Sequence, residues 1–357
     1  MLNSSSLANN QYFLDELGVR WYLDFGKDTS QVPAGVNKVP FIGEISLSTL
    51  LSTTTIASLV QAAPAGSYWY VGGEPNDPVK EVTPTEFADV FRYYHTEITA
   101  NDPTARVLSP SLLNWWFTCF SCGGYQSGRD WADGFINAYE SKYGVKPPVA
   151  AWSIDLYPLD WRGWLERLSG RDPSPFLPND NWQLVRDQIT GGTWPIVKSA
   201  GRFFNGAPTT YEGMRAYLDS RGYEDTPIWI TELAVHWGYD DIVPVFDAND
   251  QALPPEPAGS YKWDALAGFV LDIVDWLEAN ADAYQIERWF LFTTWKNIAE
   301  PAKDAYGGII LFGSEQDTQP PQAGVTPLNC LGRVYRALTL NQSRVTCDAA
   351  GGVIPAP

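Results

Sequence analysis

The chain has 357 residues, a length at which one α/β barrel can form a single domain. Its hydrophobic content of 45% is that of a globular protein, and no apolar run reaches the roughly 20 residues that span a bilayer. The 42 acidic and 24 basic residues give a formal net charge of -18. Because an anionic surface repels nucleic acid and anionic lipid, neither is expected as a partner. A monomer is also expected.

Apolar segments predict strands, and helical patterns lie between them. The predicted strands are residues 19–25, 39–45, 67–72, 106–112, 149–156, 227–233, 287–295 and 308–312. The clearest helix begins at the capping box 83–86, in which Pro84 takes the first helical position, and it buries an apolar face from Phe87 to Ile98. Further helices are predicted at residues 130–143, 182–204, 211–221, 262–280 and 328–340.

Strands that alternate with helices in this way predict an α/β fold, a (β/α)8 TIM barrel. A doubly wound open sheet would carry a glycine-rich phosphate turn, and neither that turn nor a Walker motif is present. No stretch has the composition of a linker. We therefore expect residues 1–357 to form a single catalytic domain, with a short disulfide-tied C-terminal extension from about residue 341.

The cysteines favour an oxidising compartment. Cys119 and Cys122 form a C-x-x-C among glycines and serines, and Cys330 and Cys347 lie near the C-terminus. A zinc site is possible in principle, but nothing else in either region looks like a metal ligand, so two local disulfides are the prediction. We expect a secreted, extracellular protein. Residues 1–11 are polar and do not read as a signal peptide as they stand.

Barrel enzymes place their catalytic groups at the C-terminal ends of strands. Two glutamates stand out there, because Glu74 ends the apolar run 68–73 and Glu232 ends the run 227–231. A carboxylate directly after a buried run is costly unless the site uses it, although each could also be a strand-end residue that pairs with arginine or caps a helix. Two such residues predict the acid pair of a glycoside hydrolase.

Other chemistries fit less well. The chain has two histidines, which cannot supply the usual three-histidine metal set, and no G-x-S-x-G nucleophile elbow is present. A serine hydrolase and a metal-dependent hydrolase are therefore disfavoured, and neither a metal nor another cofactor is expected. The 16 tryptophans suggest carbohydrate binding, since flat aromatic faces stack on sugar rings, but many must form the core.

Several segments resemble clan A glycoside hydrolases, with order and spacing similar to families 128 and 39. Residues 72–76 (GGEPN) resemble the G-N-E-P-N segment around the acid/base, and residues 227–232 (PIWITE) resemble the nucleophile strand. Residues 153–158, 289–295 and 326–329 resemble later parts of the same barrel. The resemblance covers residues 19–340 and implies a retaining mechanism, with Glu74 as acid/base and Glu232 as nucleophile.

The chain departs from that pattern in three ways. Gly73 stands where the clan has an asparagine that binds the sugar 2-hydroxyl, and Asp155 aligns with a histidine. The two glutamates also follow the third and sixth predicted strands, whereas the clan uses the fourth and seventh. The separation of three strands is kept, so we expect one further strand early in the chain.

The substrate is expected to be a polysaccharide or oligosaccharide with β-glycosidic bonds, and an endo-β-1,3-glucanase is the activity that the resemblance suggests. A non-catalytic carbohydrate-binding barrel is the alternative, motivated by Gly73 and Asp155. Tyr157 is expected to hydrogen-bond the nucleophile or the substrate, and each tryptophan has an alternative role in the core. The predicted substrate-binding residues are Trp21, Asp24, Glu44, Asn76, Asn114, Trp115, Asp155, Tyr157, His236, Trp237 and Trp295.

Overall fold

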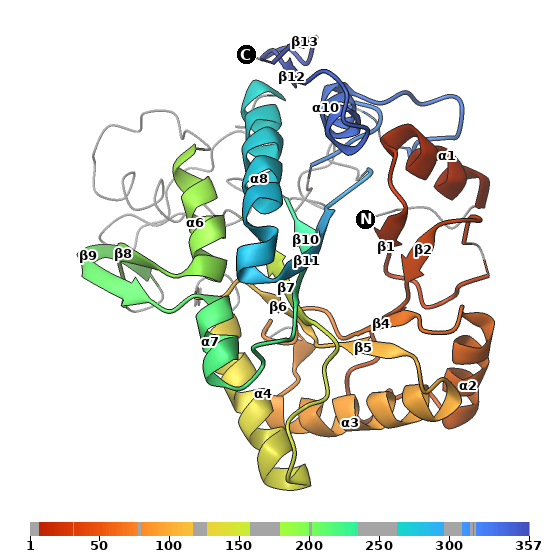
Figure 1. Cartoon of the computed structure of the whole chain (residues 1–357), viewed down its shortest axis with the longest axis vertical. Coiled ribbons are helices and arrows are strands. Elements are labelled where there is room, and N and C mark those ends of the chain that lie inside the picture. Colours follow the sequence, from red (N-terminus) through yellow and green to blue (C-terminus); the bar gives the residue numbers. More distant parts are fainter. Residues whose placement is uncertain are drawn as a thin grey trace.

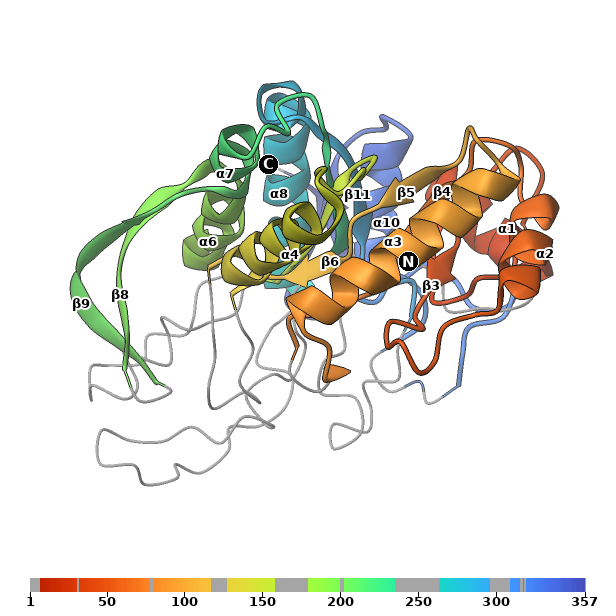
Figure 2. The same ribbon diagram turned by 90° about the horizontal axis from the view of Figure 1, so that it is seen from below.

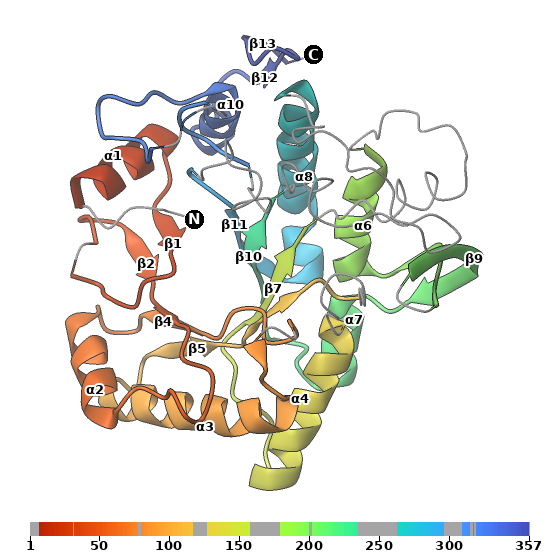
Figure 3. The same ribbon diagram turned by 180° about the vertical axis from the view of Figure 1, so that it is seen from behind.

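The computed structural model describes residues 7–30, 32–77, 80–116, 127–157, 179–199, 202–234, 263–295, 309–314, 317 and 319–356. Within these residues, parallel strands follow one another around a central sheet and helices cover its outer face (Figure 1). Figure 2 shows the same helices from below, and Figure 3 shows the strands of the first half from behind.

The strands pair in chain order. β1 (Trp21–Leu23) pairs in parallel with β2 (Asn37–Val39), and β3 (Phe41–Ile42) pairs with β4 (Tyr68–Val71), which pairs with β5 (Arg106–Leu108). β6 (Ser111–Leu113), β7 (Trp152–Leu156), β10 (Ile228–Leu233) and β11 (Ile286–Leu291) form the second run of parallel neighbours. A parallel bridge between Gly73 and Ser111 joins the two runs.

The helices pack against the outside of these strands. They are α1 (Leu7–Leu17), α2 (Thr53–Ala62), α3 (Pro84–Asn101), α4 (Gly128–Tyr143), α6 (Asn179–Thr190), α7 (Met214–Ser220), α8 (Trp263–Tyr284) and α10 (Cys330–Thr339). The core between helices and strands is unusually aromatic. Trp69, Trp131, Trp152 and Trp229 are each at most 1% exposed, so much of the tryptophan content serves packing.

This arrangement confirms the predicted α/β barrel. β4, β7 and β10 lie inside the predicted strands 67–72, 149–156 and 227–233, and every residue of these three strands is buried. Parallel strands that are covered on both faces read as continuous apolar runs, which is why the sequence locates them well. The predicted last strand appears as residues 309–312, whose backbone bonds Thr293 and Thr294 after β11.

Two predictions about elements are wrong. The helix predicted at residues 182–204 ends at Thr190, because Gly191 adopts φ 87° in the left-handed region. An antiparallel hairpin follows, made of β8 (Gly192–Ser199) and β9 (Arg202–Tyr211), and it projects from the barrel in Figures 1 and 2. The further strand expected early in the chain is also absent from the described residues ahead of β4. β2 and β3, which lie on either side of Pro40, together take the place of one barrel strand.

The C-terminal extension is tied to the last helix. Cys330 of α10 forms a disulfide with Cys347 of β12 (Val345–Cys347), which pairs with β13 (Val353–Pro355). One of the two predicted disulfides is thereby confirmed, and Cys119 and Cys122 lie outside the described residues. Among the helices that the structure describes, none is long and apolar enough to cross a membrane.

The start of α3 gives a first testable prediction. The Thr83 side chain accepts a hydrogen bond of 3.1 Å from the Glu86 backbone N–H, as the capping box predicts. Thr83→Ala removes this acceptor, so we expect the free energy of unfolding to fall by about 1 kcal/mol in urea denaturation. Thr85→Ala is the matched control, because Thr85 is exposed inside the same first turn. Equal losses in the two variants would contradict a capping role.

Candidate active site

Glu74 sits on a turn that is fastened to the neighbouring strand. Its N–H donates to the Ser111 carbonyl at 2.9 Å, and its own carbonyl accepts from Asp77 N–H at 2.9 Å. The Asn76 side chain donates to and accepts from the backbone of Leu113, both at 2.9 Å. Glu74 itself adopts φ 48°, in the left-handed region that few non-glycine residues occupy. Such strain persists where the surroundings hold it, and it concentrates at functional sites.

Gly72 makes that turn possible. Its φ is 81°, and a Cβ there would lie 2.9 Å from the Phe87 ring and 3.0 Å from Ile45. A side chain at this position would therefore collide with the core. Gly73 is less constrained, since a Cβ there would lie 3.3 Å from the Tyr70 hydroxyl and 3.6 Å from Phe41.

Glu232 reaches the site through an irregularity in β10. Ile230 pairs with Ile154 and Glu232 pairs with Asp155, so β10 contains one residue more than β7 between these two pairs. Simple alternation would send Thr231 and Glu232 to opposite faces of the sheet. The register shift instead lets both approach Asp155, since Thr231 Oγ1 donates to Asp155 Oδ1 at 2.7 Å.

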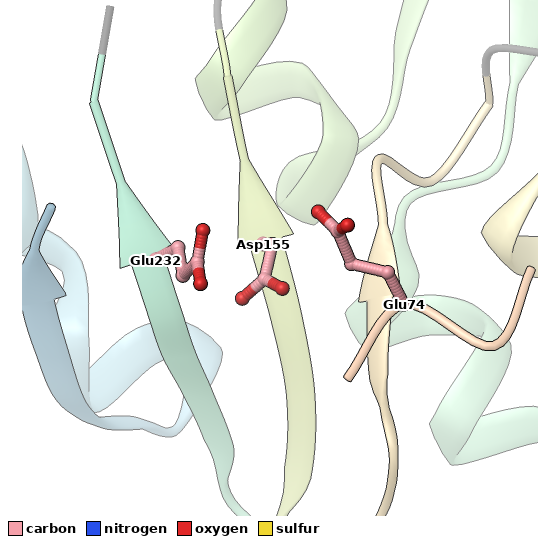
Figure 4. Close-up of side chains that lie close together, drawn as sticks. All are labelled: Glu74, Asp155 and Glu232. Atoms are coloured by element: carbon pink, nitrogen blue, oxygen red, sulfur yellow. The ribbon is translucent and has the colours of Figure 1, made fainter. Parts of the chain in front are cut away.

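The two glutamates and Asp155 converge. One carboxylate oxygen from each of Glu74, Asp155 and Glu232 lies within 4.8 Å of the others. Figure 4 shows Asp155 between the two glutamates, with Asp155 and Glu232 on the neighbouring strands β7 and β10 and Glu74 on the turn beside them. Asp155 is 1% exposed and Glu232 is 8% exposed, whereas Glu74 is partly exposed. The predicted pair therefore meets, and the residue that replaces the clan's histidine lies between its members.

Tyr157 contacts the predicted nucleophile directly. It follows Asp155 by two positions at the end of β7, so both side chains point to the same side of the strand. Its hydroxyl donates to Glu232 Oε2, which is one of the two partners, nucleophile or substrate, expected for it. Burial, followed by the charges of Glu232, Asp155 and Glu74, raises the pKa of the Tyr157 phenol well above its ordinary value, so the phenol keeps its proton.

Burial and like charge perturb the carboxyl groups strongly. Burial, and next the negative charge of Glu232, raises the pKa of Glu74 to about 8, with Asp77 adding to the effect and Lys80 opposing it. Burial, then Glu232 and Glu74, raises the pKa of Asp155 well above its usual range. A carboxyl group that holds its proton near neutral pH can act as a general acid.

Three polar residues of the site were not predicted. Ser111 and Thr231 hydroxyls lie 2.6 Å apart beneath Asp155, and hydrogen bonding from both lowers the pKa of Asp155 against the larger effect of burial. Tyr70 is buried below Glu74, where burial and the charges of Asp155 and Glu232 raise the pKa of its phenol. The inward-facing positions of β4, β6 and β10 were the signal that could have found them.

The remaining predicted polar residues lie around this centre. Asn114, with φ 52°, accepts from Tyr157 N–H at 3.3 Å through its side chain and so braces the end of β7. Asp24 pairs with Lys38 at 2.9 Å after β1, and Glu44 pairs with Lys27 after β3. These two carboxylates stand at the C-terminal ends of strands, as predicted, but cations already engage them.

The predicted aromatic residues lie in different parts of the barrel. Trp21 begins β1, with Arg288 stacked 3.7 Å from its ring centroid, so it lies at the end of the barrel opposite the carboxyl groups. Trp115 is 0% exposed and bonds the Glu212 carbonyl, which leaves no free face for a sugar. Trp295 is 8% exposed and follows β11. His236 and Trp237 lie outside the described residues.

Carboxylate oxygens that converge in this way are also the ligands that Mg²⁺ and Ca²⁺ prefer. Here, however, one oxygen of Glu232 receives the Tyr157 hydroxyl and one oxygen of Asp155 receives the Thr231 hydroxyl. These two hydrogen bonds occupy oxygens that a cation would need. Raised pKa values also suit the carboxyl groups of Glu74 and Asp155 to proton transfer.

Comparisons with known proteins bear on the fold. No family model and no curated protein matches the chain. An endo-β-1,3-glucanase of glycoside hydrolase family 128, subgroup II, from Sorangium cellulosum matches with a TM-score of 0.53 and 14% identity, over 93% of this chain and 94% of that one. A mutant family 128 subgroup I endo-β-1,3-glucanase from Amycolatopsis mediterranei, in complex with laminaritriose and laminaribiose, matches with a TM-score of 0.50 and 14% identity, over 94% and 96%.

A glucosidase from Croceicoccus marinus matches with a TM-score of 0.52 and 11% identity, over 95% of this chain and 66% of that chain. At such identities the likeness shows the fold. The chain thus shares its (β/α)8 barrel fold with the family 128 protein from Sorangium cellulosum along almost its entire length, and the expected fold is confirmed.

The electrostatics of the site predict the response of Glu74 to a change in its neighbour. Glu232→Gln removes a negative charge beside Glu74 but keeps its burial, so we expect the pKa of Glu74 to fall from about 8 while remaining above the ordinary 4.5. Carboxyl ¹³C NMR titration of glutamate-labelled protein measures this shift. Glu287→Gln, in β11 near the other end of the barrel, is the control and should leave the Glu74 titration in place. An unchanged Glu74 pKa in Glu232→Gln would contradict the geometry.

Proposed function

We propose that the chain is a retaining glycoside hydrolase that cleaves β-glycosidic bonds in a polysaccharide, with Glu74 as acid/base and Glu232 as nucleophile. The observation that carries the proposal is the closeness of the two carboxyl groups, whose oxygens lie within 4.8 Å. Retaining enzymes hold their carboxyl groups about 5–5.5 Å apart, whereas inverting enzymes separate them by about 6.5–9.5 Å to admit a water molecule.

The two groups have environments suited to different tasks. Glu74 is partly exposed and has its pKa raised to about 8, so at neutral pH it holds a proton that it can give to the glycosidic oxygen. As that bond breaks, the Glu232 carboxylate attacks the anomeric carbon and forms a glycosyl ester. Water then attacks the ester, Glu74 takes its proton, and Glu232 leaves as carboxylate.

Tyr157 supports the nucleophile in this scheme. Its hydroxyl donates to Glu232 Oε2, which orients the carboxylate for the attack. Because the Tyr157 phenol retains its proton, that hydrogen bond persists over the working pH range. We assign Tyr157 the role of positioning Glu232.

For the substrate we propose a β-glucan, with endo action on β-1,3 linkages as the first candidate. The support is the shared fold, since the family 128 proteins from Sorangium cellulosum and Amycolatopsis mediterranei are endo-β-1,3-glucanases. Loops of a barrel set its specificity, so xylan and mannan belong in the same test. We further propose secretion, because the Cys330–Cys347 disulfide suits an oxidising compartment.

The first functional prediction concerns the two glutamates. Wild type should release reducing ends from one polymer in a panel of β-1,3-glucan, other β-glucans, xylan and mannan, and Glu74→Ala and Glu232→Ala should each lower kcat by about 10²-fold or more. Glu287→Ala, in β11 near the other end of the barrel, is the control and should leave kcat in place.

The outcomes separate the competing functions. Products of the opposite anomeric configuration in NMR would rule out retention. Silence on every polymer, combined with binding to one of them, would favour a carbohydrate-binding barrel without activity. Gly73→Asn would then be informative, since a Cβ fits there at 3.3 Å from the Tyr70 hydroxyl with a small adjustment.

The pH dependence gives a second functional prediction. Glu74 must be protonated to act as acid, and its pKa is raised to about 8, so kcat/KM on the polymer should hold at neutral pH and fall as pH rises above about 8. An aryl glycoside with a good leaving group needs no proton, so its kcat/KM should fall much less over that range. The same alkaline decline with both substrates would argue against Glu74 as the acid.

A further inference from the structure

Asp155 is the buried carboxyl group that the double-displacement scheme does not use. It lies on β7 between Glu74 and Glu232 and is 1% exposed (Figure 4). Its Oδ1 accepts from Thr231 Oγ1 at 2.7 Å, whereas its Oδ2 is buried with no hydrogen-bond partner among the described residues. An ionised carboxylate in that position would leave a buried charged oxygen unsatisfied, which is costly.

We propose that Asp155 carries a proton on Oδ2 and serves as a neutral hydrogen-bond donor inside the carboxyl cluster, where it positions the two glutamates, whose oxygens lie within 4.8 Å, without adding a third negative charge. The inference deepens the proposed function and rests on it for the roles of the two glutamates. It gives Asp155 a task that an imidazole N–H could perform at this position, and that an acceptor-only carboxylate could not.

The charges around Asp155 favour the neutral form from every side. Glu232 approaches from β10 and Glu74 from the turn after β4, and both are acids. The phenols of Tyr70 and Tyr157 also face this space, and they hold their protons. No cation among the described residues contributes to the pKa of Asp155, and Lys80 acts only on Glu74, so an ionised Asp155 would face two further carboxylates without a cation of its own.

The pKa of Asp155 responds to both glutamates. Burial, followed by the charges of Glu232 and Glu74, raises it well above its usual range. The hydroxyls of Ser111 and Thr231 moderate the effect of burial on Asp155 without overcoming it.

Stability against pH tests the proton without any assay of activity. An unfolded Asp ionises near pH 3.9, whereas folded Asp155 resists ionisation, so wild type loses stability as pH rises from about 4 towards the folded pKa. Asp155→Asn is free of that loss. The Tm difference, variant minus wild type, should therefore rise by several degrees between pH 4 and pH 8.

Asp89→Asn is the matched control, because the Asp89 carboxyl group has a lowered pKa. Hydrogen bonds from Lys142 and Tyr143 lower the pKa of Asp89 in spite of partial burial. The stability that this carboxylate contributes is present above the unfolded pKa of about 3.9 and is lost as pH falls through the lower folded pKa, so the Tm difference for Asp89→Asn should change little between pH 4 and pH 8. The two substitutions are chemically identical, so a rise for Asp155→Asn alone isolates the protonation state of Asp155.

The pH profile tests the role in the reaction. If Asp155 is neutral, Asp155→Asn leaves the alkaline limb of kcat/KM at the same pH, because it removes no charge beside Glu74. Asp155→Ala, which lacks a donor, should be at least about tenfold less active than Asp155→Asn. A limb displaced to lower pH by about one unit in Asp155→Asn would show that Asp155 is ionised and would overturn the proposal.

Three further results would also overturn it. These are a Tm difference that stays constant or falls between pH 4 and 8, equal activity of Asp155→Asn and Asp155→Ala, and a rise in wild-type Tm on adding Mg²⁺ or Ca²⁺ that Asp155→Asn lacks.

If Asp155→Asn does not fold, Thr231→Val replaces it. Thr231→Val removes the 2.7 Å hydrogen bond to Asp155 Oδ1, which lowers the pKa of Asp155 in the wild type. The infrared band of the protonated carboxyl group should therefore disappear at a higher pH in this variant. If no polymer is hydrolysed, the proposed function fails, and the Tm slopes still decide the protonation of Asp155.

Discussion

The structure depends on the convergence of three carboxyl groups in a space where like charges repel and water is scarce. Glu74, Asp155 and Glu232 bring oxygens within 4.8 Å of one another, and burial is the largest influence on the pKa of both Glu74 and Asp155. Such a cluster is unfavourable unless protons are retained and the surrounding scaffold is stiff. The retained protons are also what acid catalysis requires.

The barrel supplies that stiffness through the alignment of its parallel strands. β6, β7 and β10 are neighbours, and the bridge between Gly73 and Ser111 fastens the Glu74 turn to the same sheet. Asn76 ties that turn to the backbone of Leu113, and the core behind the strands is packed with tryptophan, tyrosine and phenylalanine. The scaffold can therefore hold a strained backbone at Glu74 and a register shift at Thr231.

Much of the fold could be predicted because buried parallel strands have a strong sequence pattern. β4, β7 and β10 fall within their predicted ranges, and α3 begins at its capping residue. The helix predicted over 182–204 was wrong, since periodicity alone did not reveal that Gly191 ends it before a hairpin. The roles of the aromatic residues were also ambiguous from sequence. Trp21 and Trp115 could each have stacked on a sugar ring, but Trp21 lies at the opposite end of the barrel and Trp115 is buried.

The sequence by itself determined the class of fold and the strand ends that carry Glu74 and Glu232, because period-two alternation and apolar runs are local properties of the chain. Only the tertiary structure decided that the partner of Tyr157 is Glu232, that Asp155 lies between the glutamates, and that Ser111 and Thr231 support it. Those relations follow from the pairing of strands distant in sequence and from a one-residue register shift, and burial by distant segments determines which protons a carboxyl group keeps.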